Sequence, residues 1–156
     1  MKTKPFALIL AICFLGSGAC FASPFQGTWK LNAAKSKLGH GGERNNQVVY
    51  GWAFPARTKV TIDGTDGHGK PTHSEWIGDF DGKDYPVTGD PMSDTRGYRV
   101  VNDHTLDFWQ KKNGKVTLNG QIVVAADGKS RTVNAWDGYH HHKRIKTVAV
   151  YDKTAP

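Results

Sequence analysis

The sequence predicts an all-β protein, an up-and-down antiparallel β-barrel of about 8–10 strands that follows a cleaved signal peptide. Two-residue turn signals recur along the chain, segments of strand length lie between them, and few windows place apolar residues at helical spacing. Asp-Gly and Asn-Gly pairs favour the positive φ that tight hairpin turns require. The turn signals are Asp63-Gly64, Asp66-Gly67, Asp81-Gly82, Asn113-Gly114, Asp127-Gly128 and Asp137-Gly138. This pattern indicates a β-meander.

The N-terminus has the features of a secretory signal. Lys2 and Lys4 precede an apolar run over residues 6–15, which is too short to anchor the chain in a bilayer. We expect cleavage after residue 22, so residues 1–22 form the signal peptide and residues 23–156 form one exported domain. The expected location is periplasmic or extracellular.

Both cysteines, Cys13 and Cys20, lie in the predicted signal peptide. The exported domain is therefore expected to have no disulfide, and packing and hydrogen bonding would supply its stability. Lipidation of Cys20 is an alternative outcome of processing. Ser17, three residues before it, occupies a position where lipoprotein signals usually carry a branched aliphatic residue.

The basic residues are scattered along the chain. The sequence has 21 Lys and Arg against 14 Asp and Glu, and loss of the two lysines of the signal would leave a formal net charge of +5. The densest basic group is only Lys143-Arg144 with Lys146. Nucleic-acid-binding proteins usually concentrate their cations on one face, so we expect no nucleic-acid partner. We also expect a monomer without a membrane span.

In chain order, each expected strand is bounded by turn residues or proline. The segment 33–46 between the first two strands is expected to be a loop, since it is rich in Lys, Gly and Asn. Asn119-Gly120 predicts a bulge or kink inside one strand, because glycine weakens a strand interior. The expected strands cover residues 26–31, 47–52, 58–63, 70–80, 83–88, 96–101, 105–111, 116–124, 130–136 and 143–151.

A meander with this many strands must protect its edges. Closure into a barrel is the simplest solution, and it pairs the first strand with the last. We therefore expect Trp29 and Tyr151 to lie near the same seam.

The segment from Phe25 to Leu31, with its Gly27-Thr28-Trp29 core, resembles the opening of calycin-superfamily proteins, which include lipocalins and fatty-acid-binding proteins. The residues from Val148 to Lys153 are similar to the ending of secreted bacterial lipocalin-like proteins. The resemblance covers the two ends and the strand count between them. It implies a barrel that binds a small hydrophobic or amphipathic ligand.

The resemblance also implies a structural role for Trp29, which would plug one end of the barrel with a cation across its ring. Arg131 and Arg144 are both candidates for that cation. Fatty-acid-binding proteins hold the ligand carboxylate with an Arg-x-Tyr in the last strand. Ala149-x-Tyr151 occupies those positions here, so the tyrosine is kept and the arginine is absent.

Five tryptophans fall in five different expected strands, which is typical either of an aromatic-lined cavity or of ordinary core and surface packing. If the aromatic residues point inward beside an arginine, the cavity would suit a small amphipathic anion. The candidate ligand-binding residues are Tyr98, Arg99, Trp109, Trp136 and Tyr151, with Arg131 as an alternative to Arg99.

The triplet His140-His141-His142 could share a metal with His73 or His104, since imidazole binds zinc, copper and nickel. The triplet directly follows a turn signal and no carboxylate motif flanks it, so we assign no metal site. Asp79, Asp81 and Asp84 lack the spacing of a calcium loop and are read as turn formers.

No catalytic or nucleotide-binding motif is present in the sequence, so we expect no enzyme activity and no cofactor. The leading functional hypothesis is an exported, non-enzymatic, lipocalin-like protein that carries a small hydrophobic or amphipathic molecule. The alternative is a structural or interaction module of the bacterial envelope that has no small-molecule ligand.

Overall fold

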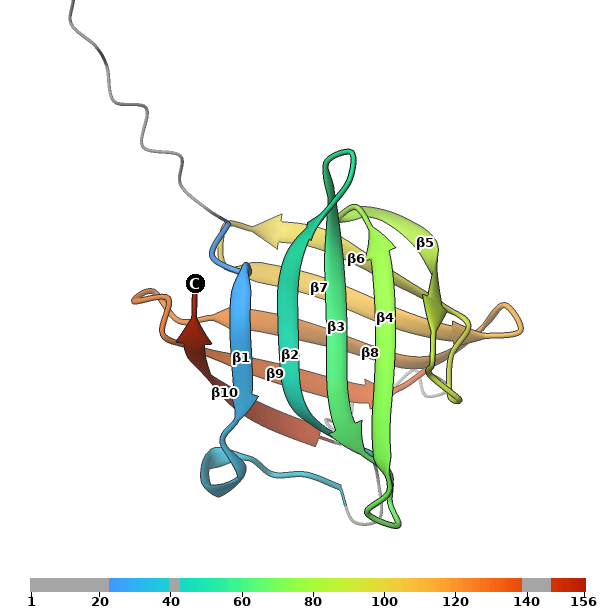
Figure 1. Ribbon diagram of the computed structural model, residues 1–156, viewed down its shortest axis with the longest axis horizontal. Coiled ribbons are helices and arrows are strands. Elements are labelled where there is room, and N and C mark those ends of the chain that lie inside the picture. Colours follow the sequence, from blue (N-terminus) through green and yellow to red (C-terminus); the bar gives the residue numbers. More distant parts are fainter. Residues whose placement is uncertain (1–22, 40–42, 139–146) are drawn as a thin grey trace, which may run out of the picture.

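The chain folds into one closed barrel of ten antiparallel strands, as a computed structural model shows (Figure 1). The structure describes residues 23–39, 43–138 and 147–156. Around the barrel the strands run in the order β1-β10-β9-β8-β7-β6-β5-β4-β3-β2, so each strand pairs with its neighbours in the chain and the two ends of the meander meet. The predicted fold class is confirmed. The expected signal peptide and the His140–His142 triplet lie outside the described residues.

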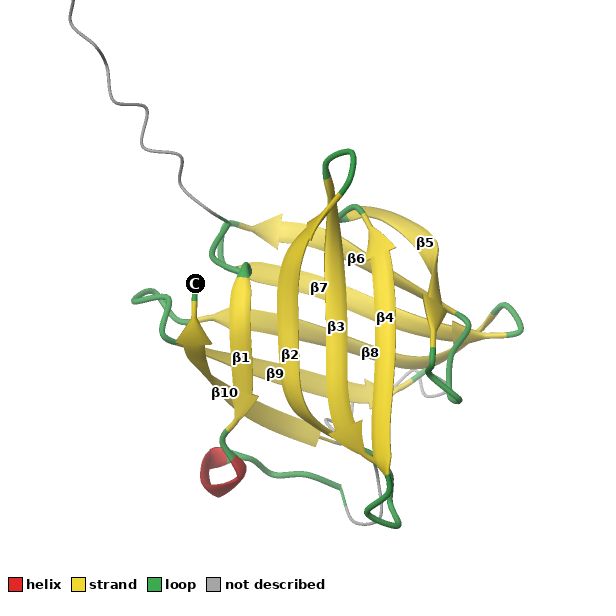
Figure 2. Ribbon diagram, viewed as in Figure 1, coloured by secondary structure: helices red, strands yellow, loops and turns green. Residues whose placement is uncertain are grey.

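Almost every described element is a strand (Figure 2). The single helix among the described residues is a three-residue 3-10 turn, η1. In chain order the elements are β1 (Gly27–Leu31), η1 (Ala33–Lys35), β2 (Arg44–Ala53), β3 (Arg57–Thr65), β4 (Pro71–Gly78), β5 (Asp81–Thr88), β6 (Thr95–Asn102), β7 (Thr105–Lys112), β8 (Lys115–Val124), β9 (Ser130–Asp137) and β10 (Thr147–Ala155). No helix in the described part of the chain is long and apolar enough to cross a bilayer.

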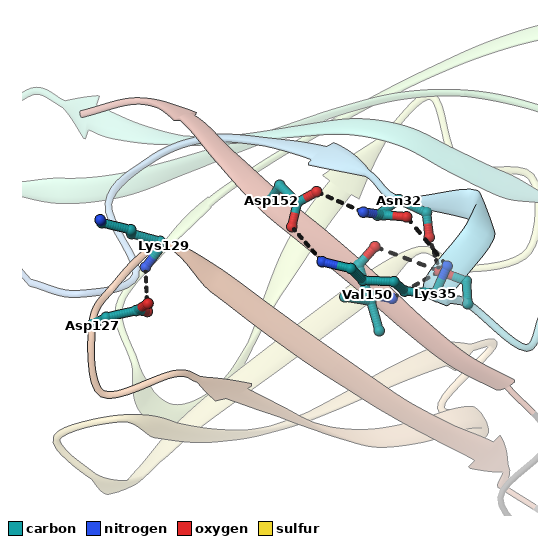
Figure 3. Close-up of polar contacts among 7 residues, drawn as sticks. Asn32, Lys35, Asp127, Lys129, Val150 and Asp152 are labelled. Carbon is teal, nitrogen blue, oxygen red and sulfur yellow. Dashed lines mark hydrogen bonds and ion pairs between the residues drawn. The ribbon is translucent and has the colours of Figure 1, made fainter.

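The barrel closes where β1 pairs with β10. Leu31 lies opposite Tyr151 and Trp29 lies opposite Lys153, which confirms the predicted seam. The chain after β1 is fastened to the same strand, because the Asn32 side chain donates to Asp152 at 2.7 Å and the Asn32 backbone N–H donates to the Val150 carbonyl at 2.8 Å (Figure 3). These bonds hold η1 beside the seam instead of over the barrel mouth.

Period-two alternation separates the inside of the barrel from the outside. In β3, for example, Val60 and Ile62 are buried while Thr61 between them is only half-buried. The buried aromatic rings gather around Trp76, which lies 4.8 Å from Tyr98 and 6.2 Å from Phe80 between ring centroids. The Trp76 Nε1 donates to the Arg96 carbonyl at 2.8 Å, so the indole N–H has a hydrogen-bond acceptor although the side chain is buried.

One end of the barrel is closed by the chain segment before β1, and we call it the plugged end. Phe25 is buried there, its ring meets Phe80 edge to face at 6.2 Å, and its carbonyl accepts from the Trp29 Nε1 at 2.9 Å. The C-terminus lies at the same end, since Thr28 pairs with Ala155 (Figure 1). This contact set gives Trp29 the plugging position that the resemblance implied.

The bulge predicted at Asn119-Gly120 is wrong. Both residues pair in register with β7 and β9, and the irregularity lies two residues earlier, where Thr117 is skipped between the partners of Gln110 and Lys111. A different physical reason explains why residue 120 is a glycine. A Cβ there would overlap the ring of Phe108, so the glycine makes room for a buried aromatic side chain.

Candidate functional site

A buried guanidinium forms the centre of the plugged end. Arg131 of β9 is 2% exposed, and its Cζ lies 4.9 Å from the ring centroids of Trp29, Tyr50 and Tyr151. These rings come from β1, β2 and β10, which the closure of the barrel brings around the start of β9. Of the two cations expected to cross Trp29, Arg131 does so, and Arg144 lies outside the described residues.

Two nitrogens of Arg131, Nε and Nη1, have no hydrogen-bond acceptor among the described residues. Aromatic faces attract a cation but they do not accept its in-plane N–H groups as an oxygen does. A buried donor that stays unsatisfied costs free energy, about 1–3 kcal/mol and more for a charged group. Arg131 is thus a buried cation whose in-plane donors are available to an acceptor.

A second cation also lies over the Trp29 ring. The Lys153 Nζ is 5.1 Å from the Trp29 ring centroid, and partial burial together with the charge of Arg131 lowers the pKa of Lys153. The nearby phenol remains neutral, because burial raises the pKa of Tyr151 to about 12. Within the described part of the chain no carboxylate forms an ion pair with either cation, so two positive charges lie near the same ring at the plugged end.

The other buried arginine is fully paired by contrast. Arg96 donates to Asp90 at 3.1 Å, and both side chains are less than a tenth exposed. Ser93 donates to the same carboxylate at 2.6 Å. The Gln110 amide, oriented by its neighbours, accepts from Arg96 at 2.8 and 3.2 Å. The sequence pattern did not indicate this ion pair. Because Arg96 is paired, the lack of an acceptor for Arg131 sets the two buried arginines apart.

The structure divides the five candidate ligand-binding residues into two groups. Tyr98 and Tyr151 are buried inside the barrel. Arg99, Trp109 and Trp136 each follow an inward-facing residue on their strands and therefore lie on the outer face. The expectation that all five face one cavity is not met. Arg131, the alternative to Arg99, lies beside Tyr151, whereas the arginine beside Tyr98 is Arg96.

The three outward residues line one shallow hollow of about 670 Å³ on the outer face of β6 to β9. A second hollow, about 480 Å³, lies outside the plugged end. Neither hollow is inside the barrel. The first is lined by Arg99, Asp107, Phe108, Trp109, Asn119, Gly120, Gln121, Asn134 and Trp136, and the second by Ser23, Pro24, Phe25, Phe80, Val100, Asn102, Asp103 and His104.

Of the carboxylates read as turn formers near the β4–β5 hairpin, only Asp81 makes turn contacts, because Asp84 instead accepts from Trp109 and Lys111 of β7. Asp81 accepts the backbone N–H of Lys83 at 3.0 Å and the hydroxyl of Tyr85 at 3.1 Å, and Gly82 takes a positive φ of 84°. This is the arrangement of a turn former. Among the described residues no group of three His, Cys, Asp or Glu side chains is placed to hold a metal.

Comparisons with known proteins assign no family. No family model and no curated protein matches the chain. Among solved structures, one described as EF1p2_mFAP2b bound to DFHBI is 13% identical, covers 84% of this chain and 94% of its own, and has a TM-score of 0.45. At this distance the likeness carries no argument about function. The molecule is a closed up-and-down barrel with a basic, aromatic centre at one end, and membership of the lipocalin-like proteins stays a prediction.

Proposed function

We propose that this chain is an exported, non-enzymatic binding protein that holds a small amphipathic anion in its barrel. The observation that carries the proposal is Arg131, a cation that is 2% exposed and has two N–H donors without an acceptor in the described residues. Export and the lack of enzyme activity are part of the proposal and rest on the sequence alone.

The arrangement suits a carboxylate or similar headgroup. A guanidinium presents parallel N–H groups that match two oxygens of one anion, and such charge-assisted bonds are among the stronger ones in proteins. Lys153 adds a second positive charge at the same ring. The buried rings of Tyr50, Tyr98 and Phe108 would receive the apolar part of the ligand.

The interior side chains pack closely, so some of them must move to admit a ligand and make room for it. The plugged end contains a segment that could move in this way. Phe25 belongs to the short segment before β1 rather than to a strand, and its contact with Phe80 is the edge-to-face pair that covers this end. Displacement of Phe25 would open the interior without breaking a strand ladder.

Binding of dodecanoate and of dodecanol tests the proposal. Both probes have the same alkyl chain, but only dodecanoate carries a charge. We expect dodecanoate to bind residues 23–156 at least about tenfold more tightly, because a charged hydrogen bond contributes about 1.5–3 kcal/mol. Arg131→Met should remove that preference, while Arg99→Met, a change on the outer face, should preserve it. Equal binding of the two probes, or no binding of either, would contradict the proposal.

A second function, an interaction module without a small ligand, is favoured by the β2–β3 hairpin. The hairpin extends beyond the barrel (Figure 1). Two large aromatic side chains near its tip are exposed, Trp52 at 73% and Phe54 at 95%. Exposed aromatics of this size are common at contact surfaces. If this is the function, Trp52→Ser with Phe54→Ser will abolish retention of the protein on isolated envelopes, and Arg131→Met will leave retention intact.

A further inference from the structure

The geometry points to a second binding site, for a neutral oligosaccharide, in the hollow on the outer face of β6 to β9. The site is independent of the barrel interior. It uses residues that the proposed function leaves unexplained, namely Arg99, Trp109 and Trp136.

Strand register places four residues in one row across this face. Gly97 of β6 pairs with Trp109 of β7, Trp109 with Asn119 of β8, and Asn119 with Trp136 of β9. Two indoles therefore flank one amide, with their backbones two strand spacings or about 10 Å apart. The hollow of about 670 Å³ lies along this row.

The first indole is held as a flat platform. A Cβ on Gly97 would overlap the six-membered ring and Nε1 of Trp109, so the indole lies directly against the glycine backbone. Its Nε1 donates to Asp84 of β5, and the same carboxylate accepts from Lys111 at 2.6 Å. The ring is held in place by its contact with Gly97 and by the carboxylate of Asp84, which lowers the entropy cost of binding on its outer face.

Polar side chains with both donors and acceptors complete the hollow. Asn119, Gln121 and Asn134 present amides to it. The two charges are matched, because Arg99 donates to Asp107 at 2.7 Å and Gln121 donates to the other oxygen of Asp107 at 3.1 Å. The described residues of the lining carry no net charge, which favours an uncharged ligand over an anion or a cation.

Neutral sugars combine the two chemistries that this lining offers. A pyranose ring has an apolar C–H face that packs on an indole and a rim of hydroxyls that donate to and accept from amides and carboxylates. Two indoles on either side of an amide suit a chain of sugar rings, whereas a single hydrophobic ligand would offer no hydrogen bonds to the amides of Asn119 and Asn134.

Titration of the purified domain with chitotetraose, cellotetraose and maltotetraose tests the site. We expect at least one of them to bind with a dissociation constant below about 10 mM. Trp109→Ala and Trp136→Ala should each weaken that binding at least about tenfold. The control Trp52→Ala removes an exposed tryptophan from another part of the barrel and should leave the affinity unchanged.

Gly97→Ala supplies a second test that keeps both indoles, since it displaces the Trp109 ring and should also weaken binding. If none of the three sugars binds, or if binding persists in the Trp109→Ala, Trp136→Ala double variant, the proposal is overturned. Dodecanoate binding should be the same in all of these variants, so the failure of this site and the failure of the interior site give different results.

Discussion

The guanidinium of Arg131 lies across the ring of Trp29, with Cζ 4.9 Å from the ring centroid. Trp29 lies in β1 and Arg131 lies in β9, and β10 lies between these two strands in the closed barrel. The contact therefore depends on closure of the barrel. It places a positive charge at the end where the chain enters and leaves the fold, with no carboxylate paired to it in the described residues.

Replacement of Arg131 separates its structural role from its binding role. Each cation–π contact contributes about 0.5–2 kcal/mol, and removal of an unpaired buried charge offsets part of that loss. We expect Arg131→Met to lower the free energy of unfolding by less than about 2 kcal/mol, measured by urea denaturation. Arg131→Ala should cost more because it leaves a cavity. A loss above about 4 kcal/mol in the Met variant would show that the charge itself holds the fold.

Anion binding should weaken at alkaline pH because of Lys153. Its pKa lies below the ordinary lysine value, so it loses its charge at a lower pH than an exposed lysine. A bound anion favours the charged form, and affinity must fall as pH rises through the pKa of the free protein. Tyr151, with a pKa of about 12, stays protonated over this range. The dodecanoate affinity of Lys153→Met should not show this fall. An identical fall in that variant would show that a group other than Lys153 causes the pH dependence.

The buried pair of Arg96 and Asp90 should be a large contributor to stability. Asp90→Ala removes one partner and leaves a buried guanidinium uncompensated, which typically costs about 3–5 kcal/mol. Arg96→Met combined with Asp90→Ala should cost less than Asp90→Ala alone, since no charge is then left unpaired. Thermal and urea unfolding of the two variants measure this difference. A double variant that is less stable than the single would contradict this explanation.

Gly120 should not tolerate a methyl group. A Cβ at this position overlaps the Phe108 ring, and overpacking of a core costs about 1–3 kcal/mol. We expect Gly120→Ala to destabilise the barrel by this amount in urea denaturation. Gly51→Ala is the matched control, because Gly51 also lies inside a strand but a Cβ there meets no atom within 4 Å. Equal effects at the two positions would exclude the packing argument.

Much of the fold could be predicted from turn chemistry. Each expected strand segment overlaps a described strand, because most of the Asp-Gly and Asn-Gly pairs and prolines mark strand ends in the sequence. The turn signal at Asp63-Gly64 is wrong, since both residues lie inside β3 and pair with β4. The pairing of the first and last strands followed from the need to protect edges, and the structure confirms it. The bounds differ by a few residues, as for β2, which begins at Arg44 instead of residue 47.

The candidate site was harder to predict, because period-two alternation gives two faces without saying which is inside. In β7 both faces carry a large aromatic, Phe108 and Trp109, and hydrophobicity does not choose between them. The choice is made by partners on other strands, since Trp109 packs on Gly97 and bonds Asp84. Likewise, nothing local to Arg96 indicates that it will be buried against Asp90.

Native mass spectrometry of the protein purified from its source cells, before and after denaturation, tests the central claim most directly. We expect one small anionic molecule per chain, released on unfolding and absent from Arg131→Met prepared in the same way. A protein that carries no ligand in either form and does not gain mass when dodecanoate is added would contradict the claim that Arg131 binds an anion inside the barrel.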